Sequence, residues 1–166
     1  MKTIEAFTIK EAYVLFPNLA QPSSYKGKLG KYDLTVLIPK KSKSGALLSN
    51  NVCEILEGND NEELWYESEY LCIKDGDTSD YSSNHGYWVL KGNNNRQIPC
   101  LNLHKQPLTP TELEEDIKQG AKVNIAVSLW YQDNEYGNRV NCNILAVQLV
   151  EKSDRVSPSV NIESFF

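Results

Sequence analysis

The sequence predicts a mainly β domain, a small closed barrel with one or two short helices and a C-terminal tail. Three observations lead to this class. Several short segments alternate between apolar and polar residues, as half-buried strands do. Long stretches rich in turn-forming residues separate these segments. The strongest helix signals come late in the chain, shortly before the last pair of strands.

Two strands are expected near the N-terminus, over residues 4–16 and 32–38. Apolar and polar residues alternate in both, and Pro39 stops the second because proline cannot donate to a strand ladder. The segment between them, PNLAQPSSYKGKLG, is a loop by composition. A short helix is expected over Ser44–Glu57, where apolar residues recur at close to helical spacing.

A polar loop, a third strand and a second helix follow. Residues Asp75–Gly86 are turn formers and polar groups, and the strand-like segment after them is broken by a turn at Gly92–Asn95. Thr109 can then cap a helix, Pro110 suits its first position, and Gly120 ends it. This helix has the clearest start and stop signals in the chain.

The last two strands form a hairpin over Val123–Leu149. Its turn, DNEYGN, contains Gly137 and Asn138, which are expected to supply the positive φ angles of a tight hairpin turn. On the first of these strands Tyr131 shares the apolar face, whereas Trp130 shares the polar one. Because an antiparallel sheet is rarely buried on both faces, we interpret Tyr131 as core and Trp130 as an exposed ring.

The number of expected strands favours a barrel over a sandwich. Five or six strands with a helix before the last hairpin suit a five-stranded barrel of the oligonucleotide-binding (OB) fold type, since a sandwich would need about seven. The strand pattern ends after Glu151. We therefore expect one domain over residues 1–150 and a flexible C-terminal tail over residues 151–166.

Composition narrows the class of protein. The chain of 166 residues is 40% hydrophobic and 23% charged, as ordinary soluble proteins are. It has no apolar run near the roughly 20 residues that span a bilayer, and its N-terminus lacks the cleavage site of a signal peptide. An intracellular protein without membrane contact is expected.

Motifs for catalysis or metal binding are missing from the sequence. It contains none of the common nucleotide-binding, hydrolase or metalloprotease motifs, so we expect neither enzyme activity nor a cofactor. The four cysteines form no CxxC pair and are expected to be reduced thiols, and Cys100 with His104 supplies too few ligands for zinc. Asp75, Asp77 and Asp80 could hold a cation, but their spacing fails the calcium-loop pattern and favours a solvated turn.

The charges are unevenly distributed along the chain. The net charge of −5 argues mildly against nucleic acid, which binds lysine and arginine. However, residues 25–43 contain six lysines and one acid, whereas residues 53–70 contain seven acids and no base. Such a dipolar surface can present a basic groove despite a negative total. Lys40, Lys41 and Lys43 are equally compatible with DNA contact and with a solvated surface.

Aromatic residues lie among the cations, a pattern that suits single-stranded nucleic acid. Unpaired bases stack on flat rings, and lysine and arginine follow the phosphates. In the third strand Tyr87 shares a face with Lys91 and is the better stacking candidate, whereas Trp88 is the better core candidate. The candidate DNA-binding residues are Lys26, Lys28, Lys31, Tyr32, Lys74, Tyr87, Lys91, Arg96, Trp130, Tyr136 and Arg139.

The order of three segments resembles a known family. KYDLTVLIPK, CIKDGDTSDYSSNHGYWVLKGNN and GAKVNIAVSLWYQDNEYGNRVNCNILAVQLV resemble the single-stranded DNA-binding proteins of tailed bacteriophages, which have small OB folds. The resemblance implies cofactor-free, sequence-independent binding that protects single-stranded DNA during phage replication, recombination and repair. It also implies a location in the cytoplasm of the infected bacterial host. The alternative is a phage structural or protein-interaction β-domain that does not bind nucleic acid.

The resemblance also gives the tail a role. Family members commonly end in an acidic tail closed by aromatic residues, which contacts replisome proteins and competes with DNA. Phe165 and Phe166 keep the aromatic end, but the last sixteen residues are barely acidic. Docking of the two phenylalanines on phage replisome proteins is therefore a better hypothesis than inhibition by charge. A homodimer is also open, because such a tail can fold onto its own groove or onto that of a neighbour.

Overall fold

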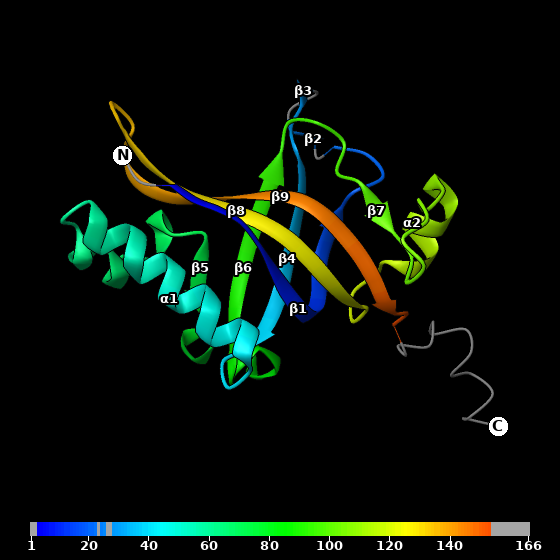
Figure 1. Cartoon of the computed structure of the whole chain (residues 1–166), viewed down its shortest axis with the longest axis horizontal. Helices are drawn as coiled ribbons and strands as arrows, with labels where there is room; N and C mark the ends of the chain where they lie inside the picture. Colours follow the sequence, from blue (N-terminus) through cyan, green and yellow to red (C-terminus); the bar gives the residue numbers. More distant parts are fainter. Residues whose placement is uncertain (1–2, 23, 26–27, 154–166) are drawn as a thin grey trace.

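The strands close into a ring, as the sequence predicts (Figure 1). The computed structural model describes residues 3–22, 24–25 and 28–153. Within this part, β1 (Thr3–Asn18) pairs antiparallel with both β4 (Tyr32–Pro39) and β8 (Lys122–Asn134). β4 pairs with β6 (Tyr87–Asn94), and β8 with β9 (Gly137–Glu151).

A parallel contact between β6 and β9 completes the ring of five described strands. Asn93 and Asn143 face each other there, and Gly92 lets the two strands approach. A Cβ atom on Gly92 would lie 2.5 Å from the Cδ1 atom of Ile144. This connectivity, in which the third long strand closes against the fifth, is that of the OB fold. The expected turn at Gly92–Asn95 starts later than predicted, because β6 continues to Asn94.

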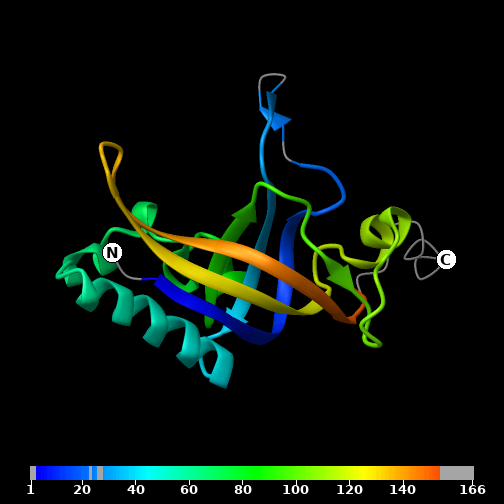
Figure 2. The ribbon, with the colours of Figure 1, turned by 45° about the horizontal axis from the view of Figure 1, so that its top comes forward.

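Shorter elements decorate the ring. β5 (Ile73–Asp75) extends the sheet beside β6, β7 (Cys100–Leu101) pairs with β9, and the small hairpin of β2 (Ser24–Tyr25) and β3 (Lys28–Leu29) lies between β1 and β4. Single turns of 3-10 helix connect α1 to β6. They are η1 (Glu62–Tyr66), η2 (Ser68–Tyr70), η3 (Gly76–Thr78) and η4 (Ser82–Asn84). Figure 2 shows the β2–β3 hairpin and the tip of the β8–β9 hairpin projecting from the ring.

Alternation along the strands fills the core. Residues at every second position of β8, from Val123 to Tyr131, are buried, and their neighbours are partly exposed. Tyr131 is only 3% exposed and its hydroxyl accepts a hydrogen bond from Asn61 Nδ2 at 2.8 Å, so its predicted place in the core is confirmed. Trp88 also packs against the core, as predicted.

The two helices lie close to their predicted positions. α1 (Lys43–Gly58) is capped by Ser42 and packs against β1, β4 and β8. α2 (Pro110–Asp116) begins at the predicted cap, Thr109, which forms a capping box with Glu112 through hydrogen bonds of 3.0 and 3.2 Å. Its helical turns end earlier than expected, and Gly120 takes a positive φ beyond them.

Two further expectations concern the turn and the thiols. Gly137 has a φ of +102°, as expected at the hairpin turn, but Asn138 is not among the described residues with positive φ, so that part of the turn prediction is wrong.

The four cysteines are free, and burial raises the pKa of Cys72 and Cys100 to about 12. No helix in the described part of the chain is long and apolar enough to cross a membrane.

Candidate nucleic-acid interface

The outward side chains of β1, β4, β5 and β6 form one continuous surface, the outer face. Leu34, Val36, Ile38 and Leu90 point into the ring and are fully buried, so their alternate neighbours point outward. Strand pairing aligns these neighbours in rows, because Lys74 is opposite Val89 and Lys91 is opposite Thr35. The outer face comprises Tyr13, Phe16, Thr35, Leu37, Lys74, Tyr87, Val89 and Lys91. Thr35 and Leu37, in the middle of this face, are only 8% exposed.

Aromatic rings lie along the β1 side of the outer face. Tyr13 meets Tyr87 edge to face, with ring centroids 6.3 Å apart, and the Lys122 ammonium lies 5.6 Å from the centroid of Tyr13. Phe16 is 62% exposed. It points outward because the register of β1 against β4 shifts between Val14 and Phe16, so that one extra residue bulges from β1.

A pocket of about 470 Å³ lies over the outer face. Thr35 and Val89 contribute from the sheet, and Lys74 lies beside them on β5. Phe16 lines it from β1, and Tyr81, which is 73% exposed, lines it from the loop between β5 and β6. The pocket therefore joins two exposed rings and an ammonium group in one hollow.

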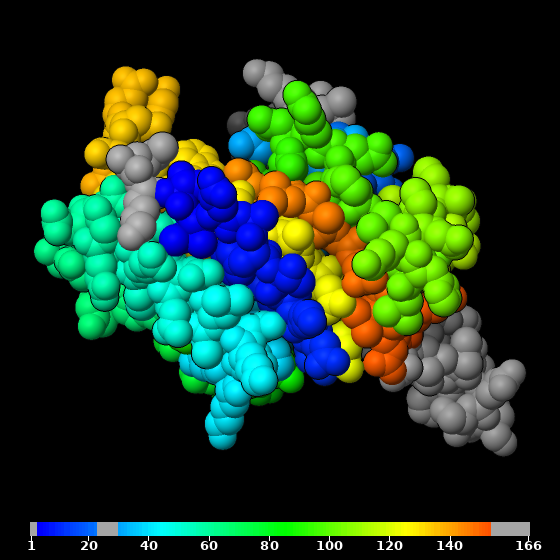
Figure 3. Space-filling model, viewed as in Figure 1, coloured from blue at the N-terminus to red at the C-terminus, as the bar shows by residue number. Residues whose placement is uncertain are grey.

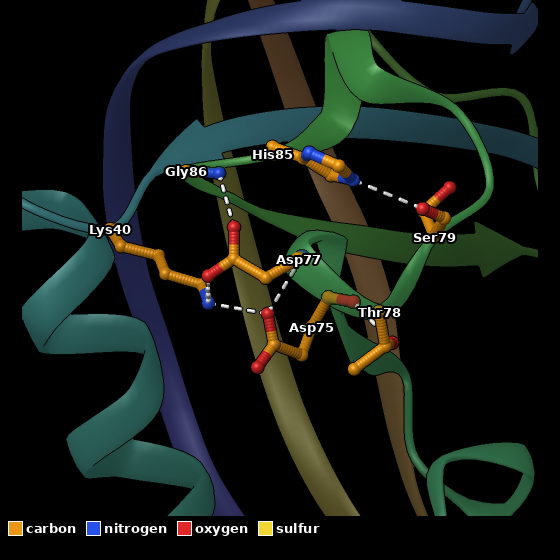
Figure 4. A network of polar contacts seen from close by, with 7 residues as sticks. All are labelled: Lys40, Asp75, Asp77, Thr78, Ser79, His85 and Gly86. Atoms are coloured by element: carbon orange, nitrogen blue, oxygen red, sulfur yellow. Dashed lines mark hydrogen bonds and ion pairs between the residues drawn. The ribbon is translucent and has the colours of Figure 1, made fainter.

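The loop that carries Tyr81 is fixed by an ion-pair network (Figure 4). Lys40, at the end of β4, donates hydrogen bonds to Asp75 and, at 2.6 Å, to Asp77. Asp77 also accepts a 2.6 Å hydrogen bond from the Gly86 N–H group. The IPK and KDGD segments that carry the family resemblance thus meet in space.

The network shifts the pKa values of Lys40 and Asp77. Burial lowers the pKa of Lys40, but hydrogen bonds and attraction from Asp75 and Asp77 outweigh it, so this pKa lies above its ordinary value. The hydrogen bond from Lys40, helped by the Gly86 N–H group and by the nearby His85, lowers the pKa of Asp77. Lys40 and Asp77 are therefore both ionised at neutral pH.

This pairing also bears on the cation that Asp75, Asp77 and Asp80 could hold. The first two carboxylates are occupied by Lys40. Among the residues that the structure describes, no group of three or more His, Cys, Asp or Glu side chains could hold a metal ion. The segment is a turn in which Asp75 and Asp77 are paired with Lys40 while their side chains stay 42% and 52% exposed.

Comparison with known proteins identifies the family. The family model described as "Enterobacter phage Enc34, ssDNA-binding protein" matches residues 6–166. The chain belongs to this family. A comparison with curated protein sequences gave no significant match.

Solved structures agree with the family assignment. The single-stranded DNA-binding protein from bacteriophage Enc34 in complex with single-stranded DNA is 26% identical, with a TM-score of 0.77 over 90% of this chain and 88% of that chain. A C-terminal truncation of the same protein is 25% identical, with a TM-score of 0.74 over 90% and 87%. The single-stranded DNA-binding protein gp2.5 of bacteriophage T7 is 16% identical, with a TM-score of 0.66 over 92% and 97%, and shares the fold.

In this family member, three of the residues predicted from sequence come together on the outer face. They are Lys74, Tyr87 and Lys91, from β5 and β6. Tyr32 instead shares the inward side of β4 and packs partly against the core. Its ring is therefore not part of the outer face.

Of the remaining predicted cations, Lys31 comes directly before β4 and Arg96 follows β6. Lys31 and Arg96 are exposed, and each flanks an end of the paired strands β4 and β6. Lys28 lies in β3. Lys26, and the tail residues Phe165 and Phe166, lie outside the described residues.

The other aromatic residues predicted from sequence, Trp130 and Tyr136, lie on a different side of the closed sheet. β8 and β9 cross in front of β4 and β6, and with β1 they form the surface seen in Figure 3, here named the front wall. Trp130 is half-buried and points outward from the front wall, as its alternation predicts. Tyr136 is 76% exposed at the hairpin tip, and the Arg139 guanidinium lies 5.1 Å from the centroid of Tyr70.

Sequence reasoning missed two rings of the outer face as site residues. Tyr13 is hidden in the sequence because its partner Tyr87 is distant in the chain. Phe16 was missed because strict alternation from the outward Tyr13 would place it inside, and only the bulge reverses it. Tyr81 is not among the candidates predicted from sequence either, because its position above the pocket depends on the fold of the loop.

Proposed function

We propose that this protein binds single-stranded DNA without sequence preference and that the strand follows the outer face. The observation that carries the proposal is the gathering of exposed rings and lysines over one face of an OB fold that belongs to the Enc34 family. Stacking of one base on a ring contributes roughly 1–3 kcal/mol, and it tolerates any base because every base has a flat face. Phosphate contacts by lysine carry no sequence information either.

The negative net charge is compatible with this role. Glu54, Glu57, Glu62 and Glu63 lie on α1 and η1, whereas Lys74 and Lys91 lie on the outer face. A phosphate beside Lys74 and Lys91 interacts most strongly with these lysines, because at 0.1 M salt the interaction between exposed charges is largely screened beyond about 10 Å. The local balance therefore decides binding.

Direct titration tests the proposal. Oligo-dT and a DNA duplex of equal length, each with a fluorescent label, are titrated with the full chain at two salt concentrations and followed by anisotropy. We expect tighter binding to oligo-dT at both, with affinity falling as salt rises. Equal affinity for the two forms, or none for either, would refute the proposal and favour a protein-interaction domain.

Matched variants locate the interface. Lys91→Ala removes a cation from the outer face, whereas Lys41→Ala removes an exposed one that follows β4. One lost phosphate contact on a single strand reduces the slope of log affinity against log salt by about 0.7. We expect this change for Lys91→Ala and not for Lys41→Ala. A larger loss for Trp130→Ala than for Tyr87→Ala would instead place the strand on the front wall.

Membership of the family supports a proposal for the wider role. The protein would protect single-stranded DNA during phage replication, recombination and repair in the cytoplasm of the host, by binding and not by catalysis. Phe165 and Phe166 would dock on replisome proteins, and either a monomer or a homodimer could do so. Pull-down of phage replication proteins by the full chain, compared with the Phe165→Ala/Phe166→Ala variant, tests the role of the tail. Equal capture by both would refute it.

A further inference from the structure

We infer that the pocket between Phe16 and Tyr81 holds one unpaired base, and that Lys40 fixes the loop that positions Tyr81. The inference rests on the proposed function, because it names the place where the strand is gripped. It adds a subsite on the outer face and a positioning residue that does not itself contact DNA.

The pocket has the shape and lining that a base requires. Its volume of about 470 Å³ falls in the range of roughly 300–1,000 Å³ found for pockets that bind small organic molecules. Phe16 and Tyr81 are 62% and 73% exposed, so both residues offer ring surface to a base. Val89 adds apolar surface, Thr35 and Asn84 add hydrogen-bonding groups, and Lys74 supplies a cation for the adjoining phosphate.

Hydrogen bonds within the loop hold Tyr81 in place. Its N–H group donates to Ser79 Oγ at 3.1 Å, and its carbonyl accepts from the Asn84 N–H group at 3.0 Å. Asn84 Nδ2 also donates to Ser79 Oγ, and His85 Nε2 lies 3.1 Å from the Ser79 carbonyl (Figure 4). Tyr81 is thus exposed at its ring but fixed at its backbone.

The Lys40 network anchors both ends of this loop. At one end Lys40 pairs with Asp75 and Asp77, and at the other its own N–H group donates to the Gly86 carbonyl at 3.0 Å. Asp77 joins the two ends through the Gly86 N–H group. Space is tight here as well, because a Cβ atom on Gly76 would lie 2.0 Å from the Asn84 carbonyl oxygen.

A fixed loop favours binding because no ordering cost is incurred when the base enters. Lys40 itself is a poor phosphate ligand, since two carboxylates already neutralise its charge and its ammonium lies 4.6 Å from the Trp88 ring centroid. Its removal would leave Asp75 and Asp77 to repel each other and would release the loop. Lys40 therefore acts on DNA through Tyr81.

Affinity for oligo-dT is measured against salt for the full chain and for Phe16→Ala, Tyr81→Ala, Lys40→Met and Lys40→Met/Tyr81→Ala. Phe16→Ala and Tyr81→Ala are each expected to weaken binding about 5- to 150-fold, the loss of one stacked base. Lys40→Met is expected to weaken it several-fold with an unchanged salt slope, and the double variant to bind no more weakly than Tyr81→Ala. Lys40→Arg, which retains the charge, is expected to restore binding.

Each outcome is decisive. If the unaltered chain binds but Phe16→Ala and Tyr81→Ala bind equally well, the pocket is refuted while the proposed function stands. A reduced salt slope for Lys40→Met, or losses that multiply in the double variant, would show that Lys40 contacts phosphate directly. Tyr66→Ala, which removes an 86% exposed ring from η1, is the control and should bind normally. If Lys40→Met fails to fold, Asp77→Asn removes the Lys40–Asp77 ion pair and weakens the bond from the Gly86 N–H group. This variant is expected to weaken binding in the unaltered chain but not in the Tyr81→Ala background, and a loss of equal size in both backgrounds would refute the role of the loop.

Discussion

Replacing Gly92 with alanine tests how the ring of strands closes. A Cβ atom there would lie 2.5 and 2.8 Å from two side-chain carbons of Ile144 and 3.0 Å from Cys142 Sγ, well inside the roughly 3.5–4.0 Å at which carbon atoms pack best. Relief requires these side chains to leave their rotamers or β6 to move away from β9. Overpacking of this kind costs about 1–3 kcal/mol, so we expect the free energy of unfolding to fall by that amount.

Urea denaturation followed by circular dichroism measures the change, and a second substitution tests its cause. Ile144→Val removes the carbon nearest to the new Cβ atom and by itself costs about 0.5–1.5 kcal/mol. If the clash is the cause, Gly92→Ala should cost clearly less in the Ile144→Val background than in the unaltered chain. Equal costs in the two backgrounds, or a cost below about 0.5 kcal/mol for Gly92→Ala alone, would refute the proposed contact between β6 and β9.

Three further predictions concern a helix cap, an ion pair and a thiol. Thr109→Ala removes the capping box of α2 and should cost about 1 kcal/mol, visible as a fall of about 2–4 °C in Tm; an unchanged Tm would contradict the cap. Because the folded-state pKa of Asp77 is lowered by Lys40, its contribution to stability is present above about pH 4 and is lost as the pH falls through that lowered pKa. Urea midpoints measured on the acid side of pH 6 should therefore fall less steeply for Asp77→Asn, and identical profiles would exclude this linkage. Cys100 is 5% exposed and burial raises its pKa to about 12, so it should resist a thiol reagent at neutral pH until urea is added; rapid labelling of Cys100 in the native chain, located by mass spectrometry, would count against this burial.

Local pattern was enough to predict most of the fold. The alternation that separates Trp130 from Tyr131, and the cap signals around Thr109, depend on residues next to one another in the chain. Such signals survive folding because tertiary contacts reinforce them. The OB topology followed because few arrangements place a helix before the last hairpin of a small barrel.

Contacts between distant residues set the limit of sequence reasoning. Lys40 was equally compatible with DNA contact and with a solvated surface, and only the fold places it against Asp75 and Asp77. Alternation also could not separate the outer face from the front wall. It shows whether a side chain points into the core or outward, but not to which outward surface it belongs. Lys91 and Trp130 were grouped on chemistry, and the curvature of the sheet separates them.

The bulge at Leu15 shows how a barrel can acquire a new binding group at little cost to its interior. One additional residue in β1 reverses the direction of the side chains that follow it, while Val14 and Leu34 keep their buried places. Insertion or deletion of one residue at such a point would thus turn the Phe16 side chain between the core and the surface without a substitution of Phe16 itself. Among distant relatives, surface chemistry can in this way diverge through changes in strand length as readily as through substitution.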